Sequence, residues 1–168
     1  IAKSNRNSAE AFVLAWIAWE GLKNRILVVG LAQHGWQRKD SEFALRQCAL
    51  YSRQDYKIAF EMTFGNPPAQ MKSLGKVWNE IEKYCRVRDS IVHGGRLWDP
   101  KDLKKATQVI VDRVTRTDWI AGARIQVGDE QLIIGNPFDR IQVNRKQARS
   151  SDELLENIQI ARNNFRKR

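Results

Sequence analysis

The stretch AEAFVLAWIAWEGLKNRILVVGLAQ, residues 9–33, decides which class of fold this chain can adopt. Its apolar side chains recur at the three- and four-residue spacing of an α-helix. Phe12, Trp16, Trp19 and Ile26 lie on one broad stripe of that helix. The spacing therefore predicts a long first helix with a wide buried face.

Two shorter helices are predicted to follow this first one. A second helical pattern begins at Ser41, which we expect to cap its N-terminus, and continues to Tyr51. A third covers Gln54 to Phe64. The run GNPP at residues 65–68 ends it, because glycine and proline interrupt helices.

The next predicted helix carries the residues of greatest chemical interest. Apolar residues at helical spacing predict one continuous helix from Met71 to Val92, closed by the glycine pair at 94–95. Asp99 and Pro100 are typical of the N-cap and first residue of a fifth helix. We therefore expect four or five helices before residue 118.

Residues 119–168 differ in character from the rest of the chain. The β-prone runs 124–127 and 131–134 flank a Gly-Asp pair and predict a hairpin. The capping box S-x-x-E at 150–153 opens a predicted terminal helix. We expect an all-α bundle over residues 1–118, with the hairpin and terminal helix as a C-terminal extension packed on the same domain.

The charge of the chain limits its partners. It carries 29 Lys and Arg against 19 Asp and Glu, a formal net charge of +10. Basic residues concentrate between Lys83 and Arg116 and in the tail after Asn144. RNA, DNA or an acidic protein would gain affinity from this charge, RNA and DNA by releasing counterions from their phosphates. The alternative is a solvated basic surface that only aids solubility.

Several classes of protein do not fit the sequence. No apolar run approaches the roughly 20 residues that span a bilayer, and residues 2–7 lack the apolar core of a secretory signal. Cys48 and Cys85 are isolated, so neither a zinc site nor a disulfide framework is predicted. We expect a cytoplasmic protein that uses no metal and no cofactor.

The run YCRVRDSIVHG, residues 84–94, holds one of only two histidines in the chain. Arg88 and His93 form an R-x4-H spacing, and the acidic Asp89 directly follows the arginine. Histidine ionises near neutral pH and can accept or donate a proton. Arginine can direct two N–H groups at phosphate oxygens and stabilise charge that develops there. The motif is therefore suited to metal-independent cleavage of RNA, in which the 2′-OH attacks the neighbouring phosphate.

This run resembles the final-helix signature of HEPN domains, especially their Apea-like and abortive-defence branches. Residues 15–22, AWIAWEGL, also resemble the opening helix of that family. The resemblance covers about residues 8–116 and implies an all-α bundle that forms a homodimer. In such a dimer two R-x4-H motifs share one cleft, often that of a ribonuclease in a toxin or antiviral defence system. An antitoxin or a larger defence-system partner is then expected.

The resemblance also assigns roles to individual residues. Arg88 and His93 take the active-site positions, and Asp89 takes the polar position beside the arginine. Glu20 is the candidate for an acidic residue supplied by another helix. Arg86 and Arg96, on either side of the motif, are expected to bind RNA. Toxin members of the family usually carry Tyr two residues after the histidine, where this chain has glycine, so regulation through that tyrosine is not expected.

Helical geometry complicates this assignment. Five residues turn a helix by about 500°, so the side chains of Arg88 and His93 point roughly 140° apart. Asp89 lies nearer to His93 in azimuth, and we expect it to orient the imidazole. A second subunit related by a two-fold axis would bring the two groups together.

Each residue also has a purely structural interpretation. His93 would be a helix-terminal histidine that favours the negative end of the helix dipole. Arg88 would form an ion pair with Glu82 or Asp89. We interpret His34 as structural, and of the six tryptophans only Trp36 and Trp98, beside loops, as able to stack on RNA.

Two other functions remain open. The chain would be a non-catalytic HEPN module that binds RNA, nucleotide or a partner protein, or one domain of a larger protein, since it starts at Ile1. Loss of Arg88 or His93 would mark the non-catalytic class, and both residues are present.

Overall fold

The computed structural model describes residues 2–47, 53–94, 98–116, 123–127, 130–134 and 150–166. These residues are predominantly helical, which confirms the predicted all-α class. The helices are α1 (Ala2–Gln33), α2 (Arg38–Gln47), α3 (Arg53–Phe64), α4 (Lys72–Glu82), α5 (Cys85–Val92), α6 (Pro100–Thr115) and α7 (Ser151–Arg166). A 3₁₀ turn, η1 (Pro68–Gln70), precedes α4.

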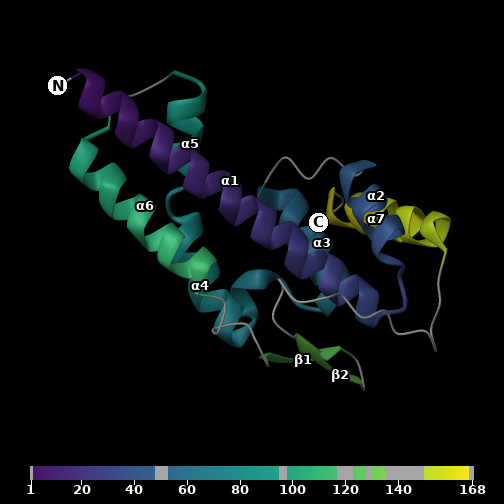
Figure 1. The fold of residues 1–168 in the computed structure, drawn as a ribbon. Coiled ribbons are helices and arrows are strands. Elements are labelled where there is room, and N and C mark those ends of the chain that lie inside the picture. Colours follow the sequence, from purple (N-terminus) through teal and green to yellow (C-terminus); the bar gives the residue numbers. More distant parts are fainter. Residues whose placement is uncertain are drawn as a thin grey trace.

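Helix α1 is the axis around which the other helices are arranged (Figure 1). Helix α6 runs alongside it, α5 lies beside its N-terminal half, and α2 and α3 pack against it further along. The core contains the rings of Trp19, Phe60 and Trp78, which are fully buried. Trp78 makes edge contacts with Trp19 at 5.9 Å and with Phe60 at 5.4 Å between ring centroids. The aromatic centre of the core therefore lies where α1, α3 and α4 meet.

Helix α1 begins seven residues before the apolar stripe that predicted it. It starts at Ala2 rather than near Ala9, and Arg6 and Asn7, which precede the apolar stripe, are exposed. An ion pair one helical turn apart, Arg6 Nε to Glu10 Oε1 at 2.9 Å, lies on these turns. Although α1 has 32 residues, no helix in the described part of the chain is long and apolar enough to cross a membrane.

The predicted single helix from Met71 to Val92 is wrong, because the chain forms two helices there. Helix α4 ends at Glu82 and α5 begins at Cys85. Tyr84 N–H donates to the carbonyl of Ile81 at 2.9 Å, a tighter three-residue bond that ends the first helix. Neither glycine nor proline marks this break, so the apolar spacing continues through it and hides it.

The count of helices and one predicted cap also need correction. Six α-helices, rather than four or five, precede residue 118 in the described part of the chain. Ser41 does not cap α2, which already begins at Arg38. The Ser41 side chain is fully buried, and its hydroxyl donates to the carbonyl of Gln37 at 3.0 Å. The predicted continuation of this helix to Tyr51 falls in residues 48–52, outside the described residues.

Other helix ends follow the local sequence as expected. The Asp99 carboxylate accepts a hydrogen bond from Lys101 N–H at 2.7 Å, and Pro100 is the first residue of α6. Gly65 follows α3 with φ of 72°, a left-handed conformation that glycine adopts without strain. Glu153 N–H lies 3.4 Å from the Ser150 hydroxyl at the start of α7. These caps are local, which is why the sequence alone revealed them.

Beyond α6 the described residues form two strands and α7. Strand β1 (Ala123–Val127) pairs antiparallel with β2 (Glu130–Ile134), and Ile125 faces Leu132 in the register. The connecting residues 128–129 lie outside the described part. Helix α7 packs on α2 and α3. It buries Leu154 and Ile158, and Arg162 Nη2 reaches Asp55 Oδ1 on α3 at 3.2 Å.

Candidate active site

The residues of the R-x4-H motif lie on α5, beside the N-terminal half of α1 (Figure 1). Arg88 occupies the middle of this helix, and His93 is its exposed C-cap. Gly94, with φ of 69°, then turns the chain away. Arg86 is exposed on the same helix, whereas Arg96 falls in residues 95–97, outside the described residues.

Arg88 joins α5 to α1 through two carboxylates. Its Nη1 donates to Asp89 Oδ1 at 2.9 Å, and its Nη2 lies 3.6 Å from Glu20 Oε1. Glu20 is held in turn by Trp16, whose Nε1 donates to the same oxygen at 3.0 Å. Arg88 and Glu20 are each about 30% exposed, with side-chain values of 28% and 31%. The structure therefore brings Glu20, predicted only weakly by the sequence, into contact with the motif.

The side chain of Asp89 is directed toward Arg88 rather than toward His93. Its second oxygen lies 3.8 Å from the Cys85 thiol. The described bond between Asp89 and His93 joins backbone atoms, with His93 N–H donating to the Asp89 carbonyl at 3.0 Å. The contacts given for the Asp89 carboxylate are with Arg88 and Cys85, and its orientation of the imidazole stays a prediction.

Arg88 and His93 do not form one site within a single subunit. Five residues of helix separate them, about 7.5 Å along the axis and roughly 140° around it. The imidazole is solvent exposed at the end of α5, while the guanidinium is held against α1. Within one chain, the two groups therefore do not lie side by side on α5.

A buried ion pair that was not predicted from the sequence lies close to Glu20 and Cys85. Lys23 Nζ lies 3.1 Å from Glu82 Oε1, and the two side chains are 3% and 1% exposed. Trp19 Nε1 donates to the same oxygen at 3.0 Å. A signal was present, because Lys23 interrupts the apolar stripe of α1 and Glu82 adjoins the buried Ile81 of α4. Only the tertiary fold showed that these two charges meet.

Aromatic rings surround the ammonium group of Lys23. Its Nζ lies 4.0 Å from the centroid of Tyr56, and 5.3 to 5.9 Å from those of Trp16, Trp19 and Trp78. Ring faces attract a cation and partly replace lost water. Burial still lowers the pKa of Lys23 below 10.5, against the attraction of Glu82. The Lys23–Glu82 ion pair thus connects α1 to the end of α4, just before α5 starts.

Replacing Tyr56 by Phe is expected to reduce the loss of stability at alkaline pH. Burial raises the pKa of the Tyr56 hydroxyl above its ordinary 10.0, so the folded chain retains a proton that the unfolded chain releases. The unfolded state then binds fewer protons, and the free energy of unfolding falls as pH rises above 10.0. Urea unfolding on both sides of that pH measures the slope for each protein. Equal slopes in wild type and variant would contradict the prediction; the contribution of Lys23 is common to both.

The structure shows which of the tryptophans and His34 are exposed and which are part of the packed interior. Trp36 is only 2% exposed and cannot stack on RNA, because the core covers its ring. Trp98 is partly buried against the same core. The predicted burial of Trp16 and Trp19 on the stripe of the first helix is confirmed, and Trp78 is buried in the same core. His34 Nε2 lies 2.7 Å from the carbonyl oxygen of Thr63, which ties the end of α1 to α3.

Beside the motif lies an exposed apolar surface, which we call the α1–α5 face. It consists of Leu14 and Ile17 on α1 and Ile91 and Val92 on α5. Leu14, Ile17 and Val92 are 67%, 56% and 52% exposed. Leu14 and Ile91 also line a shallow groove of about 410 Å³ between the two helices. Large exposed apolar side chains on two neighbouring helices are typical of a surface that another protein covers.

Within the described residues, no three His, Cys, Asp or Glu side chains are grouped so that they could hold a metal ion. Comparison of the chain with protein-family models, curated proteins and solved structures gave no match.

Proposed function

We propose that the chain is a HEPN-type endoribonuclease that cleaves RNA without a metal and leaves a 2′,3′-cyclic phosphate and a 5′-OH. One observation carries the proposal: Glu20 and Asp89, from two different helices, hold Arg88 in place on the helix that ends at the exposed His93. These are the residues that the resemblance to HEPN domains selects. The net charge of +10 supports a polyanionic substrate.

Arg88 is the group that would bind the scissile phosphate. A guanidinium has five N–H donors, and the two carboxylates engage its Nη1 and Nη2 atoms. Donors remain for phosphate oxygens, and the carboxylates restrict the orientation of the guanidinium before substrate arrives. A preorganised cation stabilises the charge of the phosphorane without first having to reorganise.

His93 is the group that would transfer protons. In the proposed reaction an imidazole accepts the proton of the 2′-OH as the O2′–P bond forms. The P–O5′ bond breaks, and the leaving 5′ oxygen takes a proton from a general acid. A second His93, from the other subunit of a dimer, would act as that acid. This arrangement needs no oxidant, reductant or metal.

The α1–α5 face is the surface on which such a dimer would form. It lies on the same helices as Glu20, Arg88 and His93, so a two-fold axis through it brings two motifs together. Burial of Leu14, Ile17 and Val92 would favour association, at about 25 cal/mol for each Å² removed from water. The composite cleft would overcome the angular separation of Arg88 and His93.

Replacing Ile17 by Asp is expected to convert the dimer to a monomer and to abolish RNA cleavage. A buried carboxylate without a partner opposes association more strongly than the loss of apolar area alone. Sedimentation velocity measures the mass, and circular dichroism shows whether the helices persist. The matched control is Phe43→Asp on α2, because Phe43 is 50% exposed and lies outside the α1–α5 face. A wild-type chain that is monomeric at all concentrations would refute the dimer.

The activity itself is tested by incubating the purified chain with tRNA, mRNA and single-stranded DNA in the presence of EDTA. We expect cleavage of RNA alone, because DNA lacks the attacking 2′-OH. Treatment of the products with a phosphatase distinguishes cyclic phosphates, which resist it, from phosphate monoesters. Cleavage of DNA, or RNA products with a 5′-phosphate, would refute this mechanism.

A non-catalytic module is the second candidate function. It is favoured by the ion pairing of Arg88, which both carboxylates partly neutralise in the free chain. Intact RNA that is nevertheless bound by the wild-type chain would support this alternative. The toxin or defence setting, with its antitoxin or larger partner, rests on the resemblance to HEPN domains.

A further inference from the structure

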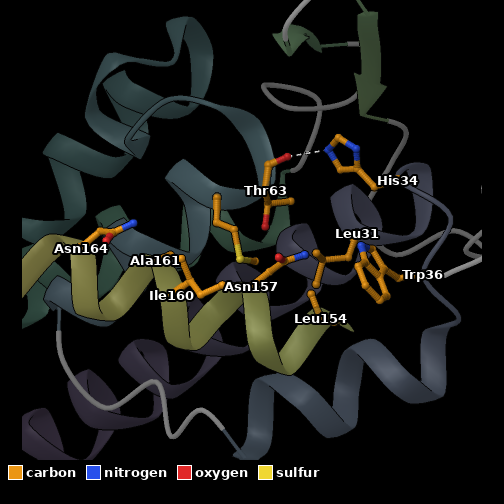
Figure 2. A pocket seen from close by; sticks show the side chains of 10 residues that line it. Leu31, His34, Trp36, Thr63, Leu154, Asn157, Ile160, Ala161 and Asn164 are labelled. Carbon is orange, nitrogen blue, oxygen red and sulfur yellow. Dashed lines mark hydrogen bonds between the residues drawn. The ribbon is translucent and has the colours of Figure 1, made fainter. Parts of the chain in front are cut away.

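A second concave site lies far from the R-x4-H motif, where the C-terminal end of α1, the end of α3 and one face of α7 meet (Figure 2). Its volume is about 490 Å³, within the range of roughly 300–1,000 Å³ typical of small-molecule sites. Leu31 lies eleven residues beyond Glu20, about 16 Å further along α1. The pocket is therefore separate from the candidate active site.

The pocket combines an apolar floor with neutral polar groups. Leu31, Trp36 and Leu154 lie at its base and are almost fully buried. Asn157 and Asn164 project from the same face of α7, two helical turns apart (Figure 2). No acidic or basic side chain other than His34 is among the described residues that line it. A ligand that fits this pocket would thus be uncharged in the part that enters it, and that part would have a flat apolar face.

His34 contributes one defined hydrogen-bonding atom to this pocket. Its Nε2 lies 2.7 Å from the carbonyl oxygen of Thr63 (Figure 2). A carbonyl oxygen only accepts hydrogen bonds, so Nε2 must carry the proton. In the neutral ring Nδ1 is then an acceptor. The Thr63 hydroxyl is itself engaged, since it donates to the carbonyl of Ala59 at 2.7 Å.

We propose that this pocket binds a nucleobase, with adenine preferred. The carboxamides of Asn157 and Asn164 each offer one donor beside one acceptor, the pattern that pairs with the N6 and N7 atoms of adenine. Because the two residues lie two helical turns apart, one of them would pair with that edge and the other would bond a different part of the nucleoside. The acceptor on His34 complements the exocyclic amine of the same base. Guanine is usually recognised through O6 and N7 by arginine or lysine, and neither is among the described residues that line the pocket. Leu31, Leu154 and Met62 would contact the faces of the ring.

The base can reach the pocket on a free nucleoside or on an unpaired residue of RNA. The proposal does not depend on the ribonuclease activity, because the pocket shares no residue with the motif. If the base belongs to RNA, the pocket would give an RNA-binding chain a preference for certain sequences. The two sources are distinguished by titrating the His93→Ala variant, in which cleavage should be far slower under the proposed mechanism, with adenosine and with short oligo(A) and oligo(U).

Isothermal titration calorimetry of the intact chain tests the proposal. We expect saturable binding of adenosine or oligo(A), at least tenfold tighter than that of uridine or oligo(U). Asn157→Leu and Asn164→Leu should each weaken it by at least tenfold. Asn163→Leu is the matched control, because Asn163 is exposed on α7 next to Asn164 and does not line the pocket. Binding of adenosine alone would identify a free ligand, and binding of oligo(A) alone would identify RNA.

Three results would overturn the proposal. The first is the absence of saturable binding of both probes up to millimolar concentration. The second is unchanged affinity in the Asn157 and Asn164 variants, and the third is equal loss in the Asn163 control. Circular dichroism of each variant shows that α7 is still folded. RNA cleavage is measured separately, so failure of base binding is distinguished from failure of the proposed activity.

Discussion

The His93→Ala variant is expected to cleave RNA about 10²–10⁴ times more slowly than the wild type, the usual contribution of a general acid or base. His93 is exposed at the C-cap of α5, so its truncation should leave the fold intact. Initial rates in EDTA, with circular dichroism of both proteins, measure the effect. An unchanged rate would show that another group transfers the proton.

Arg88→Ala is expected to lower the rate by a comparable factor, and Arg88→Lys should restore little of it. An ammonium cannot donate two N–H groups to a phosphate in the parallel geometry of a guanidinium. Arg116→Ala is the control for net charge, because Arg116 is exposed and ends α6 away from the site. If Arg116→Ala slowed cleavage as much as Arg88→Ala, general electrostatics would explain the effect.

Replacing Glu82 by Ala is expected to lower the free energy of unfolding by about 3–5 kcal/mol. The change leaves the Lys23 ammonium buried without its partner, and removal of one member of a buried ion pair typically costs that much. It also removes the acceptor for Trp19 Nε1. Urea denaturation followed by circular dichroism measures the loss.

The double variant Lys23→Met/Glu82→Gln should be much closer to wild type than Glu82→Ala. Methionine fills the aromatic cage without charge, and glutamine keeps an oxygen for Trp19. Buried ion pairs replaced as a unit by neutral groups are often nearly neutral in stability. A double variant as unstable as Glu82→Ala would mean that packing, and not the buried charge, dominates. A loss below about 1 kcal/mol in Glu82→Ala would contradict the prediction.

A feature of this fold could be predicted from the sequence where neighbouring residues determine it. The end of α3 at Gly65 and the cap of α6 at Asp99 followed from single residues and their neighbours. The break between α4 and α5 did not, because no helix-breaking residue marks it. Ser41 has the residue type of a cap but lies inside α2. The helix begins earlier, at Arg38, in a polar segment that the apolar spacing did not mark as helical.

The candidate site shows the same division. The spacing of Arg88 and His93 and the acidic residue after the arginine could be read directly from the sequence. The contact of Arg88 with Glu20, the orientation of Asp89 and the α1–α5 face could not, because each joins helices distant in the chain or depends on competing partners.

The sequence by itself determined the helical class, the broad apolar stripe of α1, the local caps and the residue types of the motif. These depend on periodicity and on interactions between near neighbours, which any window of the sequence contains. The tertiary structure alone decided which charges meet: Lys23 with Glu82, 59 residues apart, and Arg88 with Glu20. Each of these pairs joins two helices that are distant in the chain, so it depends on how the helices pack, and no local pattern records that packing.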